Sequence, residues 1–328
     1  MFKLEFRLDK PIKLSDSPVD LLAVGEVLID LISQEEADTF LEVESFKRYF
    51  GGSPANIAMN LARLGKKSAL ISRVGFDGLG EYLIKRLEEA GVITDSISID
   101  RDNNTTVIMV TRSQNSPKFI AYRGAEKFID SDEIKDGDIC KSKIIHLSTF
   151  ALSAPKSRRA IEKIIKIARD QDKVISLDPN YRPQLWEGTE DGIEYIKNLL
   201  PKIDIIKPSL DDAEALFGRG DAASYIKSFH QRGCKLVILT QGAAGLIVST
   251  GEEIKHFDSL ATEVVDTTGA GDAFWSGFYT GISSGYSLEL AVQLGNSVAA
   301  EVIKEVGAIV DLPAEELLLE KYNLGPVK

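Results

Sequence analysis

Short apolar, β-branched runs alternate with stretches of helical spacing along most of this chain. The runs and the helical patterns that follow them lie at 21–25 and 54–64, 68–74 and 79–90, 143–147 and 155–171, and 174–177 and 191–200. Strands that alternate with helices pair in parallel and need helices over both faces of the sheet. The alternation therefore predicts an α/β protein with a mostly parallel central sheet.

One segment interrupts this alternation. Two short apolar runs, 107–110 and 118–122, flank the turn-forming residues 114–117 and predict a β-hairpin. A hairpin inserted among strand–helix units suggests a small β element that covers a site. Residues 1–19 show no clear pattern, and we expect either a tail or an added strand there.

The stretch that matters most chemically is a glycine turn near the C-terminus. Gly269, Ala270, Gly271 and Asp272 follow a β-branched run and precede a helical pattern. The backbone N–H groups of a helix N-terminus lack intrahelical partners and carry partial positive charge, so such a turn can hold an anion. A carboxylate beside it can take a proton from a hydroxyl while the turn holds the growing negative charge. An ordinary glycine loop with a capping Asp is the simpler interpretation.

Composition narrows the classes of partner and compartment. Among 328 residues, 50 acidic side chains outnumber 39 basic ones, which argues against nucleic acid or an anionic membrane as partner. Cys140 and Cys234 are far apart, with neither metal spacing nor a disulfide framework. The chain has no apolar run of membrane-spanning length, and its charged first residues do not resemble a secretory signal. We therefore expect a cytoplasmic protein.

Three common signatures are missing. There is no G-x-x-x-x-G-K-[ST] loop for phosphates, and the first strand runs into Gly25-Glu-Val-Leu rather than G-x-G-x-x-G. His146, His230 and His256 do not have metal-ligand spacing.

Four motifs together resemble a known family. The stretches 51–56, 63–65 and 75–80, read with 266–272, resemble the two signatures of the ribokinase-like (PfkB) carbohydrate kinases. The similarity extends from about residue 21 to 313. It implies a three-layer α/β/α sandwich formed by a kinase domain of about 20–325, with a small β-sheet lid from about 30–50 and 97–123. It also implies ATP and Mg²⁺ as cofactors, with K⁺ as an optional third.

The sugar would bind near the first motif. Asp30 ends an early strand, where a carboxylate can accept hydrogen bonds from two vicinal hydroxyls. Gly51 and Gly52 let the backbone approach a sugar closely, and Asn56 offers both a donor and an acceptor. The family uses the matching positions for its substrate. The simpler alternatives are a solvated strand end for Asp30 and a helix cap for Asn56.

A second sugar-side motif is the stretch 178–186. It resembles the D-x-N-x-R-x-x-L-W pattern of fructokinases and of 2-keto-3-deoxygluconate kinases. Arg182 follows a strand end and offers a fixed fork of donors to a phosphate or a sugar oxygen. Arg123 ends the hairpin and resembles a lid residue that reaches the sugar. A surface salt bridge for Arg182 and an ordinary exposed position for Arg123 remain open.

The resemblance also implies a nucleotide side. Ser209 and Asp212 stand where many relatives carry N-x-x-E, a motif associated with magnesium-bound phosphates, and the shorter Asp212 can act through water. The residues expected to contact the nucleotide are Thr240, Gly242, Gly245, Gly269, Gly271 and Asn296. A potassium site would involve Asp266, Thr268 and Gly307.

These features predict a fructokinase-type enzyme that transfers the γ-phosphate of ATP to a sugar primary hydroxyl, D-fructose being the first choice. Asp272 would be the base, and the amides of 269–272 would stabilise the transferred charge. The alternatives are a 2-keto-3-deoxygluconate kinase, a nucleoside kinase and a non-catalytic sugar-binding regulator. Apolar residues on the lid strands also predict a homodimer formed through the lid.

Overall fold

A nine-stranded sheet forms the centre of the molecule. The computed structural model describes residues 4–113, 118–186 and 191–325. The strand order is β13-β12-β11-β10-β9-β8-β1-β4-β5, and all neighbours from β5 to β11 pair in parallel. The strands are β1 (Val19–Val24), β4 (Ser68–Gly75), β5 (Ile97–Asp100), β8 (Ser142–Ser148), β9 (Val174–Asp178), β10 (Ile205–Ile206), β11 (Leu236–Thr240), β12 (Leu246–Ser249) and β13 (Ile254–Phe257). β12 and β13 pair antiparallel.

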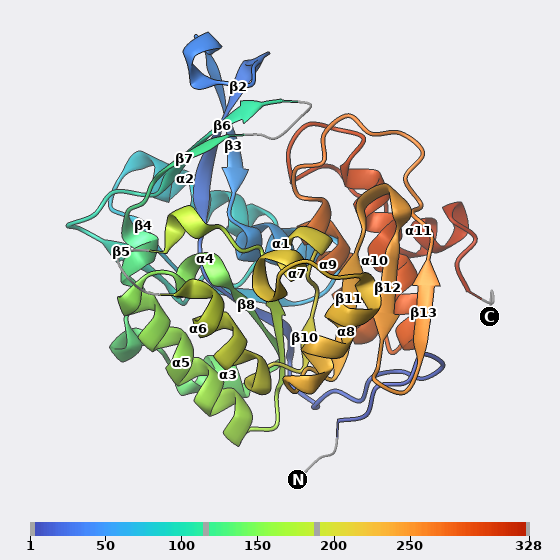
Figure 1. The fold of residues 1–328 in the computed structure, drawn as a ribbon. Helices are drawn as coiled ribbons and strands as arrows, with labels where there is room; N and C mark the ends of the chain where they lie inside the picture. The colour runs from blue at the N-terminus through green and yellow to red at the C-terminus, as the bar shows by residue number, and fades with distance from the viewer. Residues whose placement is uncertain (1–3, 114–117, 187–190, 326–328) are drawn as a thin grey trace.

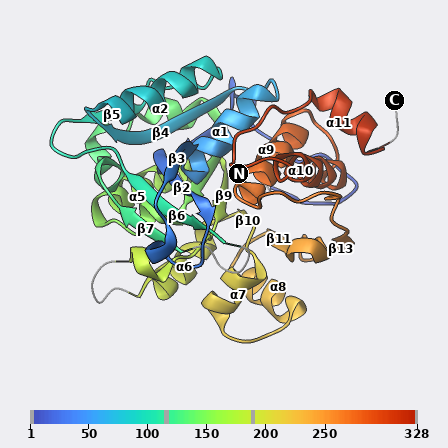
Figure 2. The same cartoon turned by 90° about the horizontal axis from the view of Figure 1, so that it is seen from above.

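Helices cover both faces of this sheet, as its two-sided burial requires. One face packs against α1 (Ser53–Arg63), α2 (Gly78–Glu89), α9 (Ala270–Ser283) and α10 (Leu288–Val302). The other packs against α3 (Asp136–Cys140), α4 (Thr149–Leu152), α5 (Pro155–Asp170), α6 (Gly192–Leu199), α7 (Leu210–Phe217) and α8 (Ala222–Gln231). α11 (Glu315–Lys321) packs outside α10. Figure 2 shows the two helix layers, and the predicted three-layer α/β/α sandwich is confirmed.

A second, four-stranded sheet projects above the first (Figure 1). This small sheet has the order β3-β2-β6-β7 and consists of β2 (Leu28–Glu36), β3 (Phe46–Gly51), β6 (Val107–Arg112) and β7 (Phe119–Tyr122). β6 and β7 form the expected hairpin, whose turn at 114–117 lies outside the described residues. Residues 97–100, expected in the lid, instead form β5 at the edge of the large sheet.

Residues 4–18, the described part of the chain before β1, are neither a loose tail nor a strand of either sheet. Phe6, Leu8 and Ile12 are buried in the core beside α9 and α10. The N–H groups of Leu288 and Glu289, at the start of α10, donate to the carbonyls of Lys10 and Leu8. We call this segment the strap, because it packs across one end of the helix layer that contains α9 and α10. In the described part of the chain no helix is long and apolar enough to cross a membrane.

Candidate active site

The polar motifs gather at the carboxyl ends of the parallel strands. Asp178 ends β9, Lys207 follows β10 and Thr240 ends β11, while Gly25 follows β1. In open α/β sheets ligands bind at this edge. The small sheet and the starts of α1 and α9 border the same region, which is therefore the candidate active site.

The glycine turn has the geometry expected of an anion-binding helix start. Gly269 caps α9 with a φ of 77°, which favours glycine. A Cβ on Gly269 would lie 2.3 Å from the Cβ of Ala308, so the close packing also requires glycine. Ala270 and Gly271 lie in the first turn of α9, where backbone N–H groups have no intrahelical acceptor. The Ala270 N–H donates to the carbonyl of Thr267 at 3.2 Å, which leaves the Gly271 N–H to face a ligand. The predicted turn therefore leads directly into its helix, with Asp272 as the next residue.

The Asp272 carboxylate is held by the start of another helix, α1. Its Oδ1 accepts a hydrogen bond from Ser53 Oγ at 2.6 Å, and its Oδ2 accepts one from Asn56 Nδ2 at 2.9 Å. Burial raises the pKa of Asp272 to about 6, although both hydrogen bonds act to lower it. The side chain is only partly covered. A carboxylate with this pKa can accept a proton from a hydroxyl at neutral pH.

Lys207, which no sequence motif singled out, also lies at this edge of the sheet. Its Nζ lies 2.9 Å from Asp178 Oδ2, and the side chain is buried. A Cβ placed on Gly271 would lie 3.2 Å from the same Nζ, so this cation sits directly beneath the glycine turn. Trp275 Nε1, on α9, also donates to Asp178 Oδ2 at 2.9 Å. A lysine directly after a buried strand end was the sequence signal that could have indicated it.

The sugar-side carboxyls are close to Asp272. Burial, together with the charge of Asp272, raises the pKa of Asp30 to about 7. Burial likewise raises the pKa of Glu26 to about 8. Asp30 lies against the backbone of Gly51, since a Cβ there would be 2.1 Å from Asp30 Oδ2. Several carboxyl groups in one buried region disfavour each other's ionisation.

Gly52 and Asn56 lie on the same side. Gly52 has a φ of 99°, and a Cβ there would lie 2.6 Å from the carbonyl oxygen of Glu26. Asn56 is buried and directs its Nδ2 at Asp272, whereas its Oδ1 has no partner among the described residues. A substrate hydroxyl could donate to that oxygen.

Arg123 and Arg182 differ in how much of their hydrogen-bonding capacity is used. The Arg123 guanidinium is buried and donates to Glu126 Oε1 at 2.6 Å, to Ser153 Oγ at 2.6 Å and to the Phe150 carbonyl at 3.1 Å. It therefore ties the end of β7 to the core, and the alternative of an ordinary exposed arginine is wrong. Arg182 is exposed and donates to the carbonyl of Tyr181.

The end of the 178–186 stretch is an anchor for its own loop. Trp186 packs beside Tyr195, with ring centroids 5.7 Å apart, and the Arg158 guanidinium lies 5.2 Å from the Trp186 ring. A Cβ on Gly192 would lie 2.4 Å from Trp186, so the ring also packs closely on the start of α6. This cluster of tilted aromatic rings holds the loop that carries Arg182.

On the nucleotide side, Asp212 forms a capping box at the start of α7. Its Oδ2 accepts from the N–H and Oγ of Ser209 at 3.0 and 2.7 Å, and its Oδ1 accepts from the Tyr181 N–H at 2.9 Å. Burial, with the charge of Asp178, raises the pKa of Asp212. A nearby cation would favour its ionised form.

The other expected nucleotide residues fall into two groups. Thr240, Gly242 and Gly245 lie at the end of β11 and in the turn that leads to β12. Asn296, on α10, is buried and donates through Nδ2 to the carbonyl of Asp258 at 2.7 Å. The residues of both groups therefore help to set the backbone conformation at this edge of the large sheet.

The three residues expected at a potassium site do lie together. Asp266 Oδ1 accepts from the N–H and Oγ1 of Thr268 at 3.0 and 2.8 Å, and Oδ2 accepts from the Gly307 N–H at 3.0 Å. Asp266 thereby joins the segment before α9 to the segment after α10.

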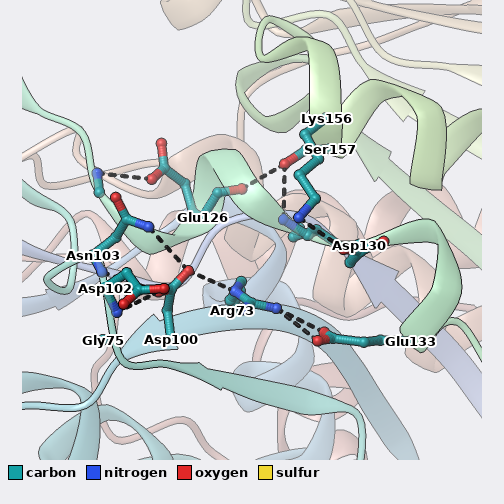
Figure 3. A network of polar contacts seen from close by, with 12 residues as sticks. Arg73, Gly75, Asp100, Asp102, Asn103, Glu126, Asp130, Glu133, Lys156 and Ser157 are labelled. Carbon is teal, nitrogen blue, oxygen red and sulfur yellow. Dashed lines mark hydrogen bonds and ion pairs between the residues drawn. The ribbon is translucent and has the colours of Figure 1, made fainter.

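Figure 3 shows a second polar network, which includes residues of β4 and β5 at the edge of the large sheet. Arg73 Nε donates to Asp100 Oδ2 at 2.8 Å, and its Nη1 donates to Glu133. Although burial acts to raise it, donors led by Arg73 lower the pKa of Asp100 to about 2. Ser157 Oγ donates to the carbonyl of Glu126, which connects α5 to the Arg123 cluster. This network joins β4 and β5, at the edge of the large sheet, to the turn that contains Glu133.

Comparisons with known proteins show the family and the fold of this chain. The pfkB family carbohydrate kinase model matches residues 19–315. An ATP-dependent 6-phosphofructokinase of Thermoanaerobacterium thermosaccharolyticum is 47% identical over 324 residues, 98% of this chain and 100% of the relative. A fructokinase structure from Halothermothrix orenii has 41% identity and a TM-score of 0.77, covering 85% of this chain and 98% of its own. An uncharacterized Pyrococcus horikoshii sugar kinase in complex with ATP has 32% identity and a TM-score of 0.80, covering 92% and 97%.

Proposed function

The chain belongs to the pfkB family of carbohydrate kinases, and we propose that it transfers the γ-phosphate of ATP to the primary hydroxyl of D-fructose. One observation carries this proposal: the partly exposed Asp272 carboxylate stands beside the Gly269–Gly271 turn at the start of α9. A base next to an anion-binding turn is what phosphoryl transfer to an alcohol requires.

In the proposed reaction, Asp272 accepts the hydroxyl proton as the sugar oxygen bonds to the γ-phosphorus. The bond from that phosphorus to the bridging oxygen breaks, and ADP leaves. The N–H groups of the glycine turn face the transferred charge, and Lys207 supplies a positive charge from beneath it. The small sheet would act as the lid that excludes water.

The cofactor assignments are part of the proposal. Asp212 would hold Mg²⁺ through water, and a buried carboxyl whose pKa is raised suits a nearby cation. When bound, Mg²⁺ neutralises charge on the polyphosphate. Asp266, Thr268 and Gly307 would border K⁺. Thr240, Gly242, Gly245 and Asn296 would shape the nucleotide site.

The sugar side favours a neutral substrate. Asp30 and Glu26 are carboxyl groups, and Arg123 is already engaged by Glu126 and three further acceptors, Ser153 Oγ and the carbonyls of Phe150 and Leu185. A phosphorylated or acidic sugar would need a cation there, and of the two expected arginines only Arg182 is exposed. These contacts support fructose over a keto-acid such as 2-keto-3-deoxygluconate.

Fructose 6-phosphate is the second candidate substrate. It is favoured by the 47% identical relative, which is an ATP-dependent 6-phosphofructokinase. For this substrate the acceptor would be the other primary hydroxyl, and Arg182 would be the cation available to its phosphate.

Steady-state rates with ATP and Mg²⁺ test the assignment. We expect kcat/KM on fructose to exceed that on fructose 6-phosphate and on 2-keto-3-deoxygluconate by at least about tenfold, a step of about 1.4 kcal/mol. A higher value on either competitor would replace fructose as the substrate. Sugar binding without turnover of any of the three would instead favour the non-catalytic regulator.

We also propose that the protein forms a homodimer through the small sheet. We place it in the cytoplasm, with ATP as the phosphate donor. β7 is an edge strand, and its Ile120 and Tyr122 side chains are exposed. Exposed apolar edge strands are prone to pair with another strand. Light scattering on the wild type and on an Ile120→Lys variant would test the pairing.

A further inference from the structure

The start of α1 is built to present one hydroxyl to Asp272. Gly52 allows the sharp entry into the helix, and Ser53 is the first helical residue, followed by Pro54. The Ser53 N–H donates to Glu26 Oε1 at 3.3 Å. The backbone N–H of Ser53 is therefore engaged by Glu26, which lies between β1 and β2, and its hydroxyl by Asp272 of α9.

The two contacts to Asp272 involve different oxygens of its carboxylate. Ser53 Oγ holds Oδ1 and Asn56 Nδ2 holds Oδ2, although 219 and 216 residues separate the partners. Donors on both oxygens oppose rotation of the carboxylate about its terminal torsion, which is otherwise broad. Each oxygen keeps a second acceptor position, so a substrate hydroxyl can still approach.

The charges around Asp272 make the donors important. Asp178 and Lys207 face it from the ends of β9 and β10, and Glu26 and Asp30 face it from the sugar side. Burial and the neighbouring carboxyls oppose ionisation of Asp272, whereas Lys207 and the two hydrogen bonds favour it. The hydroxyl of Ser53 is one of only two side-chain donors that the described residues give this carboxylate.

We propose that Ser53 is a positioning residue, which together with Asn56 fixes the Asp272 carboxylate in its orientation and keeps it available as a base. Asn56 was expected to bind the sugar, and its free Oδ1 allows it to do both. Ser53 acts on the reaction through Asp272 alone. The inference rests on the proposed function, because it assigns Ser53 a part in proton removal.

The experiment compares Ser53→Ala with wild type. We expect kcat to fall about tenfold, because a donor to a charged group is lost, while KM for the sugar stays within about threefold. The acid limb of the kcat profile should move up by about one pH unit, since the ionised base has lost a hydrogen bond. Ser287→Ala is the matched control, because Ser287 caps α10 through its hydroxyl away from the site. It should leave both limb and kcat unchanged.

A second readout does not depend on the sugar. Carbon-13 NMR of labelled aspartate carboxyls, with the Asp272 signal assigned from Asp272→Asn, should show a higher titration midpoint in Ser53→Ala than in wild type. An unchanged midpoint would overturn the proposal even if the enzyme phosphorylates fructose. A raised midpoint would support it even if fructose is not the substrate. A rise in KM alone would make Ser53 a sugar ligand and would also overturn it.

Discussion

On the sugar side of the proposed site, side chains are already bonded to one another. On the nucleotide side, stretches of backbone and apolar side chains are exposed to solvent. Asn56 and Glu26 are buried at the junction of the small sheet and the core. Val264 and Val265, just before the glycine turn, are 59% and 56% exposed. The two sides meet at Asp272.

This difference indicates how each substrate would be selected. Carboxyls with raised pKa values, about 7 for the half-buried Asp30 and about 8 for the buried Glu26, suit the hydroxyl groups of a neutral sugar. An open edge of backbone and glycine turns suits a large anionic ligand, which is bound by N–H groups and metal rather than by a closed pocket. Three substitutions test this contrast. One lies where the two sides meet, and each of the others lies on one of the two sides.

The largest effect is expected at the meeting point. Asp272→Asn keeps the shape and the contact with Ser53 but removes the base. We expect kcat to fall roughly a hundred- to ten-thousand-fold, as general bases contribute. Calorimetric titration should show that fructose and ATP still bind. Turnover within about threefold of wild type would remove Asp272 from the mechanism and leave the two sides without a shared base.

Lys207→Met should have an intermediate effect that falls on phosphoryl transfer. Removing the cation beneath the turn should lower kcat about ten- to a hundredfold, with fructose binding unchanged. The substitution also leaves the Asp178 carboxylate without its ion-pair partner, which can destabilise the fold.

The control is therefore the double variant Lys207→Met with Asp178→Asn, which removes both charges. If the double variant regains stability but not kcat, the loss belongs to catalysis. If its kcat returns to the wild-type value, Lys207 acts only as the partner of Asp178.

The smallest effect concerns stability on the sugar side. Burial raises the pKa of Glu26 from 4.5 to about 8, so the folded state retains a proton that the unfolded state releases. Stability must then fall as the pH rises from about 4.5 to 8. Glu26→Gln carries no such proton, and its unfolding free energy should fall less over this window, by more than about 1 kcal/mol.

Urea unfolding at pH 5 and pH 8 measures this difference. Glu44→Gln, an exposed position on the loop before β3, is the control and should follow the wild-type slope. Equal slopes in Glu26→Gln and wild type would mean that Glu26 is ionised in the folded protein, and the contrast between the two sides would disappear.

The sequence predicted what depends on local pattern. The alternation of strands and helices gave the layered fold, and the turn at Gly269 required only its own residues and the following helix. The parallel strands then fixed which edge carries Asp178 and Thr240.

The sequence did not predict contacts that depend on how distant elements dock. The bond from Ser53 to Asp272 exists because α1 and α9 start at the same point, and no local pattern encodes that. The engagement of Arg123 by Glu126 and α4, and the strap through Phe6, likewise depend on packing across the whole fold. Lys207 was missed because an isolated lysine after a strand is usually solvated.

The burial of α9 has a consequence for the conformational fluctuations of the folded protein. Every residue from Ala273 to Ile282 is buried, whereas the small sheet alternates covered and open positions. Amide hydrogens in α9 should thus exchange with water only when the whole protein opens, while those of the small sheet exchange through local fluctuations. The Asp272 carboxylate, in the first turn of this helix, is therefore attached to the last part of the protein to unfold. The small sheet can thus open and close many times while the proposed base keeps its position.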